Sequence, residues 1–170
     1  MDLFSMRGFE ETTVAQIAER AGLTERTFFR HFADKREVLF AGSGDLLELL
    51  VTAVDRMPAT ASPMEAVAAG LEAAGAVFNQ ERRLYSRQRQ AIIAANAELR
   101  ERELIKLASL GGAIAETLRR RGVQEPAASL TTEAGMGVFR VAFGRWVDPS
   151  NGHDWTELVR DSLARLKQLV

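Results

Sequence analysis

Residues 12–39 read TTVAQIAERAGLTERTFFRHFADKREVL, and this stretch decides how the rest of the chain is interpreted. Apolar residues from Val14 to Ala21 recur at helical spacing, which predicts a short helix that Thr12 or Thr13 caps and Gly22 ends. Thr24 is a natural cap for a second helix. Two short helices joined by a glycine-containing turn are typical of DNA-binding helix-turn-helix units.

The second helix is predicted to have an inner and an outer face. Spacing assigns to the inner face Leu23, Thr27, Phe28 and Phe32, and to the outer face Glu25, Arg26, Phe29 and Arg30. The major groove of B-DNA admits one helix, and polar or basic side chains near the N-terminus of that helix reach base edges and phosphates. Arg26 is therefore the best candidate for reading a base.

The pattern T-V-x-x-I-A-x-x-A-G-L-T-x-x-T-F-F-x-H-F-x-D-K-x-x-V-L resembles the N-terminal signature of TetR-type one-component transcriptional regulators. The resemblance implies roles position by position. Hydroxyl caps that touch phosphates fall at Thr13 and Thr24, further backbone contacts at Thr27, His31 and Lys35, and the base-reading position at Arg26 with Glu25 beside it. Phe29 stands where the family usually has a tyrosine, so the ring is kept and the hydroxyl hydrogen bond to the DNA backbone is lost.

The charge balance counts mildly against nucleic-acid binding. The net charge is −1, and residues 1–40 hold six Lys or Arg against seven Asp or Glu. Groove recognition by a dimer needs only a few well-placed contacts on each half. Four basic residues lie close together near the proposed recognition helix: Arg26, Arg30, Lys35 and Arg36. Strong salt dependence of binding is expected.

Composition excludes several other classes of protein. Hydrophobic residues at 46% and charged residues at 26% are typical of a soluble globular protein. The absence of cysteine excludes disulfides and thiol chemistry, and no apolar run is long enough to span a bilayer. The N-terminus lacks a signal-peptide pattern, so a cytoplasmic address is expected. No catalytic constellation is recognisable, so we expect no enzyme, no metal and no cofactor; His153 stands in a turn without a ligand-spaced partner.

The segments on either side of the motif depart from the family pattern. Met1–Phe9 reads as the end of an amphipathic helix, too short for the first helix of such domains, so either residues precede it or the domain is abbreviated. From Asp34 a third, longer helix is predicted. Gly42–Gly44 interrupts it, and the resemblance makes this helix the connection to an effector domain. A regulatory hinge, and a local kink or break without regulatory meaning, are equally open interpretations.

The remaining chain predicts an all-α protein with about nine helical segments. We expect a helix-turn-helix DNA-binding domain over residues 1–41 and a helical effector-binding and dimerisation domain over residues 42–170, the latter loosely resembling regulators of the mycofactocin system. Arginines decorate a helix beginning near Glu81, namely Arg82, Arg83, Arg87 and Arg89. One interpretation is that these arginines bind an anionic effector. The favoured interpretation is that they are solvated or paired with neighbouring carboxylates.

Residues 134–147 are apolar nearly all round, so this helix needs two packing partners. Small residues would permit a close dimer seam, and aromatic residues could pack inward or line a pocket. The predicted pocket comprises Phe78, Tyr85, Ile92, Phe139, Arg140, Phe143 and Trp146. The predicted dimer interface comprises Ala134, Gly137, Val141, Trp155, Leu158, Ser162 and Leu166, since in the family the last two helices pair with their copies.

The resulting hypothesis is a homodimeric repressor that binds a palindromic DNA operator and is released by a small, largely apolar effector. Two alternatives stay open: a helical carrier of small molecules, and a protein-interaction module that has kept a DNA-binding shape. A carrier would bind its ligand without any effect on DNA affinity. An interaction module would instead require a protein partner.

Overall fold

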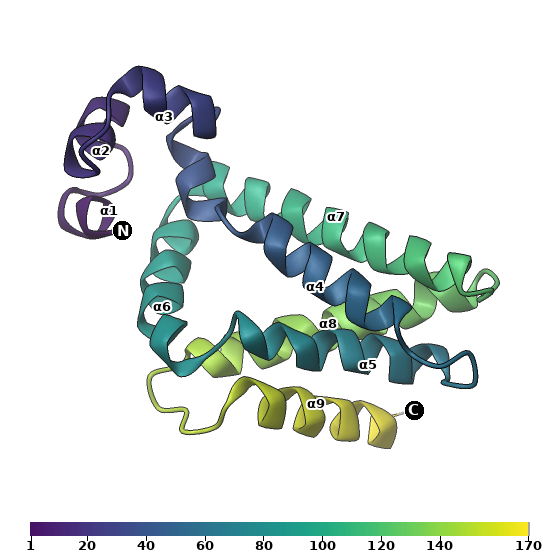
Figure 1. Cartoon of the computed structure of the whole chain (residues 1–170). Helices are drawn as coiled ribbons and strands as arrows, with labels where there is room; N and C mark the ends of the chain where they lie inside the picture. The colour runs from purple at the N-terminus through teal and green to yellow at the C-terminus, as the bar shows by residue number, and fades with distance from the viewer. Residues whose placement is uncertain (170) are drawn as a thin grey trace.

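The computed structural model describes residues 1–169 as nine α-helices and two 3₁₀ helices, with no strand in that range (Figure 1). The predicted all-α fold is thereby confirmed. The bounds of the elements are α1 Asp2–Arg7, α2 Val14–Arg20, α3 Glu25–His31, η1 Lys35–Phe40, α4 Ser43–Asp55, α5 Pro63–Ala73, η2 Ala74–Ala76, α6 Gln80–Ala95, α7 Ala97–Arg120, α8 Ala127–Val147 and α9 Trp155–Leu169.

Local capping explains where the helices of the motif begin. The Thr13 hydroxyl accepts the backbone N–H of Gln16 at 3.3 Å, and the Gln16 side chain accepts the N–H of Thr13 at 3.0 Å, which forms a capping box. The Thr24 hydroxyl accepts the N–H of Thr27 at 3.2 Å at the start of α3. Gly22 has φ +68°, so a residue without Cβ suits the turn between the two helices.

Two predictions for this region are wrong. The long third helix expected from Asp34 is the six-residue 3₁₀ helix η1, capped by the Asp34 carboxylate; the chain then turns through Gly42, with φ +87°, before α4 begins. The glycine therefore separates two elements rather than bending one. Leu23, predicted to face inward, is 46% exposed and lies in the turn before α3 begins.

Buried apolar side chains form two separate clusters. The larger one holds together α4, α5, α7, α8 and α9, and includes residues such as Leu50, Leu71 and Ile114. The smaller one joins the N-terminal helices to the rest of the chain and comprises Phe4, Phe9, Leu39, Phe40, Ile93 and Leu99. In Figure 1, α1–α3 lie at one end of the molecule, and α6 runs from their neighbourhood towards α5 and α8. The helix-turn-helix is thus mounted on the ends of α6 and α7.

Candidate nucleic-acid interface

Helix α3 presents a polar face to solvent and is anchored from beneath by one aromatic residue. Phe28 is buried, and the centroid of its ring lies 5.2 Å from the ring centroid of Phe32 and 5.5 Å from that of Phe29. On the outer side Phe29 is 53% exposed, and the other exposed residues of α3 are Glu25, Arg26, Arg30 and His31. The side chains that the sequence assigned to DNA contact on α3 therefore share one accessible face, with Thr27 half-buried beside it.

The two predicted hydroxyl contacts lie at the starts of the two helices. Thr13 and Thr24 are both exposed, and each hydroxyl oxygen already accepts a backbone N–H. The Thr24 hydroxyl also shares a hydrogen bond of 3.0 Å with that of Thr27. The Thr13 hydroxyl still has its O–H donor to offer, and the Thr24–Thr27 pair has one O–H left after the bond between the two, so a phosphate oxygen could bind at either helix start without breaking the cap.

Several basic side chains near the motif are occupied within the chain. Arg36 forms an ion pair of 2.6 Å with Asp34 and a longer one of 3.4 Å with Glu98 on α7. The hydrogen bond from the Arg36 guanidinium holds the pKa of Asp34 below its ordinary value. Lys35 donates to backbone carbonyls. Of the four basic residues near the motif, Arg26 and Arg30 are the two that lie exposed on α3.

The short helix η1 is tied to the larger part of the molecule by charged side chains. Glu37 accepts hydrogen bonds from Arg102 and pairs with Lys106 at 3.5 Å, both on α7. Arg89 of α6 donates to the Leu39 carbonyl at 2.6 Å. These contacts of η1 with α6 and α7 could not be predicted from the sequence. The paired residues lie about 50 to 65 residues apart in the chain, and only the fold brings them together.

The structure brings together four of the seven predicted pocket residues. Phe78 lies 5.8 Å from Phe139, 5.4 Å from Phe143 and 5.3 Å from Trp146, between ring centroids, and 4.4 Å from Trp155. These rings form a packed aromatic cluster. The other three residues lie elsewhere: Tyr85 and Arg140 are exposed, and Ile92 packs in the smaller cluster beside the N-terminal helices.

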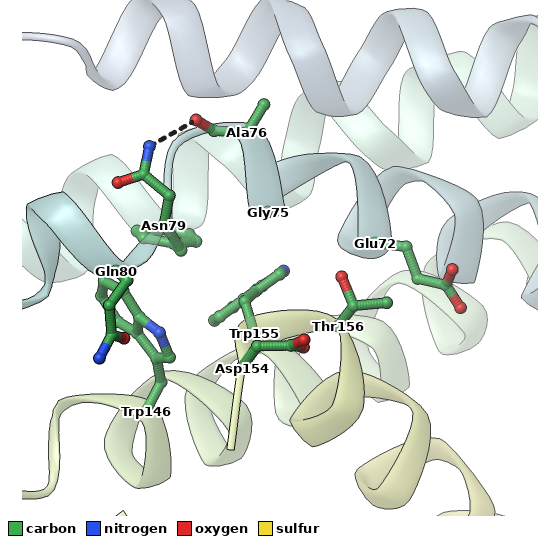
Figure 2. A pocket seen from close by; sticks show the side chains of 10 residues that line it. Glu72, Gly75, Ala76, Asn79, Gln80, Trp146, Asp154, Trp155 and Thr156 are labelled. Carbon is green, nitrogen blue, oxygen red and sulfur yellow. Dashed lines mark hydrogen bonds between the residues drawn. The ribbon is translucent and has the colours of Figure 1, made fainter. Parts of the chain in front are cut away.

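An open hollow of about 470 Å³ borders the aromatic cluster where α6 and α9 begin (Figure 2). Phe78, Trp146 and Trp155 contribute its apolar side, and Asn79, Gln80, Asp154 and Thr156 are among its polar lining. The Trp155 indole N–H is used internally, donating to the Leu71 carbonyl at 2.6 Å. A second hollow of about 530 Å³ lies between α1 and α6 and includes Phe9, Ile92 and Asn96.

Two arginines of α6 hold the connection between α8 and α9. Arg83, only 6% exposed, donates to the carbonyls of Asn151 at 3.2 Å and His153 at 2.5 Å. Arg87 donates to the carbonyl of Val147 at 2.8 Å and to that of the next residue at 2.7 Å. The favoured interpretation, that the arginines of this helix are solvated or paired with carboxylates, is wrong for Arg83 and Arg87, whose partners are backbone carbonyls of a distant turn. It holds for Arg89, which pairs with Glu103 at 3.0 Å, and for Arg82, which is exposed. The four-residue spacing that places Arg83 and Arg87 on one side of α6 was the available signal.

The predicted dimer residues divide into surface and interior positions. Val141 is 56% exposed, with Ala134 and Gly137 half-buried on the same side of α8. Trp155, Leu158 and Ser162 are buried inside the protomer, and Leu166 packs partly against the larger cluster. Three of the predicted contacts are therefore filled by the chain itself, because the apolar face of α9 turns towards α5 and α8 rather than outward.

Comparisons with known proteins identify the family. A family model described as bacterial regulatory proteins, tetR family, matches residues 1–41, and one described as the MftR C-terminal domain matches residues 61–170, more than half of the chain. The chain belongs to the TetR family. Both the N-terminal resemblance and the looser resemblance of the later portion to mycofactocin-system regulators are thereby confirmed.

Two named relatives resemble different lengths of this TetR-family chain. The HTH-type transcriptional regulator TcmR of Streptomyces glaucescens is 40% identical over 73 residues, which cover 43% of this chain and 32% of TcmR. The provisionally named mycofactocin biosynthesis transcriptional regulator MftR of Mycobacterium tuberculosis is 27% identical over 121 residues, 71% of this chain and 61% of MftR. The chain thus spans less than two thirds of the length of either relative.

Solved structures of the TetR family share the fold. The Thermus thermophilus transcriptional repressor FadR, crystallised in complex with lauroyl-CoA, is 26% identical, with a TM-score of 0.58 over 98% of this chain and 89% of FadR. A regulator from Aquifex aeolicus gives a TM-score of 0.59 at 18% identity over 99% of this chain and 94% of its own, a likeness of fold alone. Within residues 1–169 the TetR-family chain has no helix that is long and apolar enough to cross a membrane.

Proposed function

We propose that this TetR-family chain is a cytoplasmic repressor of transcription that binds a palindromic operator as a homodimer and leaves it when a small molecule binds. Residues 1–41 form the DNA-binding domain in this proposal, and residues 42–170 form the effector-binding and dimerisation domain. The single observation that carries it is the exposed polar face of α3, with Arg26 near the N-terminal end of a helix that is firmly anchored by Phe28.

Exposure supports the roles that we propose within the DNA-binding domain. Arg26 is free to reach a base edge, where a bidentate contact to guanine is the commonest specific contact. The remaining residues of the interface are proposed to touch the DNA backbone or lie against it: Thr13, Thr24, Glu25, Thr27, Phe29, Arg30 and His31. Phe29 would contribute van der Waals contact with its exposed ring, since it has no hydroxyl.

The dimer is proposed to form across the exposed stripe of α8. Its members recur at intervals of four and three residues, which places them on one side of the helix: Leu130, Ala134, Gly137, Val141 and Gly144. Leu130 is 66% exposed, and a Cβ atom added at Gly137 or Gly144 would meet nothing within 4 Å. An apolar stripe with small residues allows a second α8 to approach closely, and the buried residues of α9 support it from within.

The effector is proposed to be largely apolar and to enter among the aromatic rings of Phe78, Phe139, Phe143 and Trp146. The complex of FadR with lauroyl-CoA supports an effector with an apolar chain, because that repressor shares the fold at 26% identity. Because these rings are packed together, a ligand would have to part them. Relieving repression decisively takes about 5.5 kcal/mol of preference for the non-binding conformation.

A gel-shift titration tests the proposal. The probe is the duplex that flanks the gene of this chain, with a random duplex of equal length as the control, and lauroyl-CoA is the first ligand tried. We expect specific binding that Arg26→Ala makes less selective between the two duplexes. Ligand binding without any effect on DNA affinity would indicate a carrier instead. Neither activity, together with a requirement for a protein partner, would indicate an interaction module.

A further inference from the structure

The ammonium group of Lys35 is enclosed by backbone carbonyls. Its Nζ donates to the carbonyl oxygens of Phe9 at 2.8 Å, Glu10 at 2.9 Å and Thr12 at 3.1 Å. It also lies 4.6 Å from the centre of the Phe9 ring, a favourable position for a cation. A lysine ammonium has three N–H donors. All three are used inside the chain, and none is left for a phosphate oxygen.

The three carbonyls belong to the corner between α1 and α2. Thr12 is fully buried at this corner, and its hydroxyl donates to the Gly8 carbonyl at 2.7 Å. The next residue, Thr13, is the cap at which α2 begins. The hydrogen bonds of Thr12 and of Lys35 to this corner together fix the direction in which the chain enters α2. Helix α2 in turn packs against α3.

Lys35 is carried by an element that is itself held by the effector-domain side of the molecule. Arg89 of α6 donates to the Leu39 carbonyl at 2.6 Å, and Glu37 accepts hydrogen bonds from Arg102 of α7. Lys35 is therefore the direct polar link by which η1 grips the α1–α2 corner. A displacement of η1 would move the corner through this ammonium group.

We propose that Lys35 is a positioning residue that holds α2 and α3 in the orientation required for DNA binding, and that it does not contact a phosphate. This differs from the backbone contact that the family resemblance implies for this position. The inference rests on the proposed DNA-binding function. The set of three carbonyls around the Lys35 ammonium group, which we call the cage, is a property of the free chain and can be tested without DNA.

The salt dependence of binding distinguishes the two roles. Loss of a phosphate contact lowers the slope of log Kd against log salt by about 0.9, or about 1.8 for a dimer. We expect Lys35→Met to weaken operator binding by about tenfold or more, as the loss of charge-assisted hydrogen bonds does, with the slope unchanged. The matched control is Arg30→Met, because Arg30 is exposed on α3 and should lower the slope. A lowered slope for Lys35→Met would overturn the proposal.

A second substitution keeps the charge and changes only the geometry. A planar guanidinium cannot direct three donors at three converging carbonyls as a tetrahedral ammonium does, whereas it binds phosphate at least as well. We therefore expect Lys35→Arg to bind the operator as weakly as Lys35→Met. Affinity equal to that of the unaltered chain would overturn the positioning role.

Chemical reactivity of the unaltered chain provides a measurement that depends on neither variant folding nor DNA binding. The chain has three lysines, Lys35, Lys106 and Lys167, of which Lys167 is exposed. Mass spectrometry after brief acetylation should find Lys35 modified at least about tenfold more slowly than Lys167, since its donors are occupied. Equal rates would overturn the cage. If the chain binds no duplex but Lys35 is protected, the proposed function fails while the cage stands.

Discussion

Replacement of Gly70 by alanine tests how closely α4 and α5 are packed. A Cβ atom at Gly70 would lie 2.8 Å from Cγ2 of Val54 and 3.1 Å from the carbonyl oxygen of Leu50, whereas ordinary contacts begin near 3.4 Å. Both neighbours are fully buried, one being β-branched and the other backbone. Overpacking of this kind costs about 1–3 kcal/mol. The better helix propensity of alanine returns about 1 kcal/mol.

We therefore expect Gly70→Ala to lower the free energy of unfolding by up to about 2 kcal/mol, and the Tm by up to about 8 °C for a chain of this size. Urea and thermal denaturation at fixed protein concentration measure both quantities. Gly112→Ala on α7 is the matched control, since nothing lies within 4 Å of its added Cβ. That control should gain about 0.5–1 kcal/mol.

A double substitution sharpens the same test. Val54→Ala removes the methyl group that the new Cβ would meet, so the pair Gly70→Ala and Val54→Ala should be less destabilised than the sum of the two single changes. If Gly70→Ala proves as stable as Gly112→Ala, or if the two changes are simply additive, α4 and α5 are not in the close contact described.

Three further predictions concern other parts of the molecule. Val141→Glu should convert the proposed dimer into a folded monomer in sedimentation experiments, because it places a charge in the proposed α8 seam. The Arg36 hydrogen bond lowers the pKa of Asp34 in the folded chain, so its contribution to stability is present above the unfolded pKa of about 3.9 and is lost as the pH falls. Asp34→Asn should therefore be less stable at pH 7 in urea titrations and approach the unaltered chain below about pH 4. Arg83→Met should speed proteolytic cleavage within residues 148–154, because it removes two carbonyl hydrogen bonds from that turn.

Each of these three has an outcome that would count against its reasoning. Leu104→Glu, at another exposed apolar position outside the seam, should leave the dimer intact, and equal dissociation by both charges would argue against α8 as the seam. A stability difference for Asp34→Asn that is constant from pH 7 to pH 3 would exclude the ion-pair explanation. Unchanged cleavage of the α8–α9 connection in Arg83→Met would mean that other contacts hold that turn.

The sequence predicted those features that depend on neighbours along the chain. The caps at Thr13 and Thr24 and the glycine turn at Gly22 follow from local hydrogen bonding and backbone freedom, and all three are present. The all-α fold and the family could be recognised on this basis.

Features that depend on long-range packing could not be predicted in the same way. Residues 35–40 contain enough apolar side chains for an α-helix. They instead form a 3₁₀ helix that lies between the Asp34 cap and the turn at Gly42. The family resemblance placed part of the dimer interface on the apolar face of α9, but Trp155 and Leu158 are buried inside the protomer. A face that must be buried does not reveal whether the same chain or a second copy buries it.

Charged residues show the same limit. Lys35, Arg83 and Arg87 are all candidates for anions when read from the sequence, and each instead donates to backbone carbonyls. Arginine and lysine bind carbonyls, carboxylates and phosphates through the same donors, so residue type alone does not distinguish these partners. Exposure and distance in the fold separate Arg26 and Arg30 from the rest.

Selection of binding sites from a pool of random duplexes tests the central claim most directly. If the unaltered chain binds as the proposed dimer, it should enrich a palindromic site whose half-sites are centred about 10 base pairs, or a multiple of that, apart. Arg26→Ala should enrich sites in which at least one position of each half-site has lost its preference. No enrichment over the starting pool, or the same site selected with equal stringency by Arg26→Ala, would contradict DNA recognition by α3.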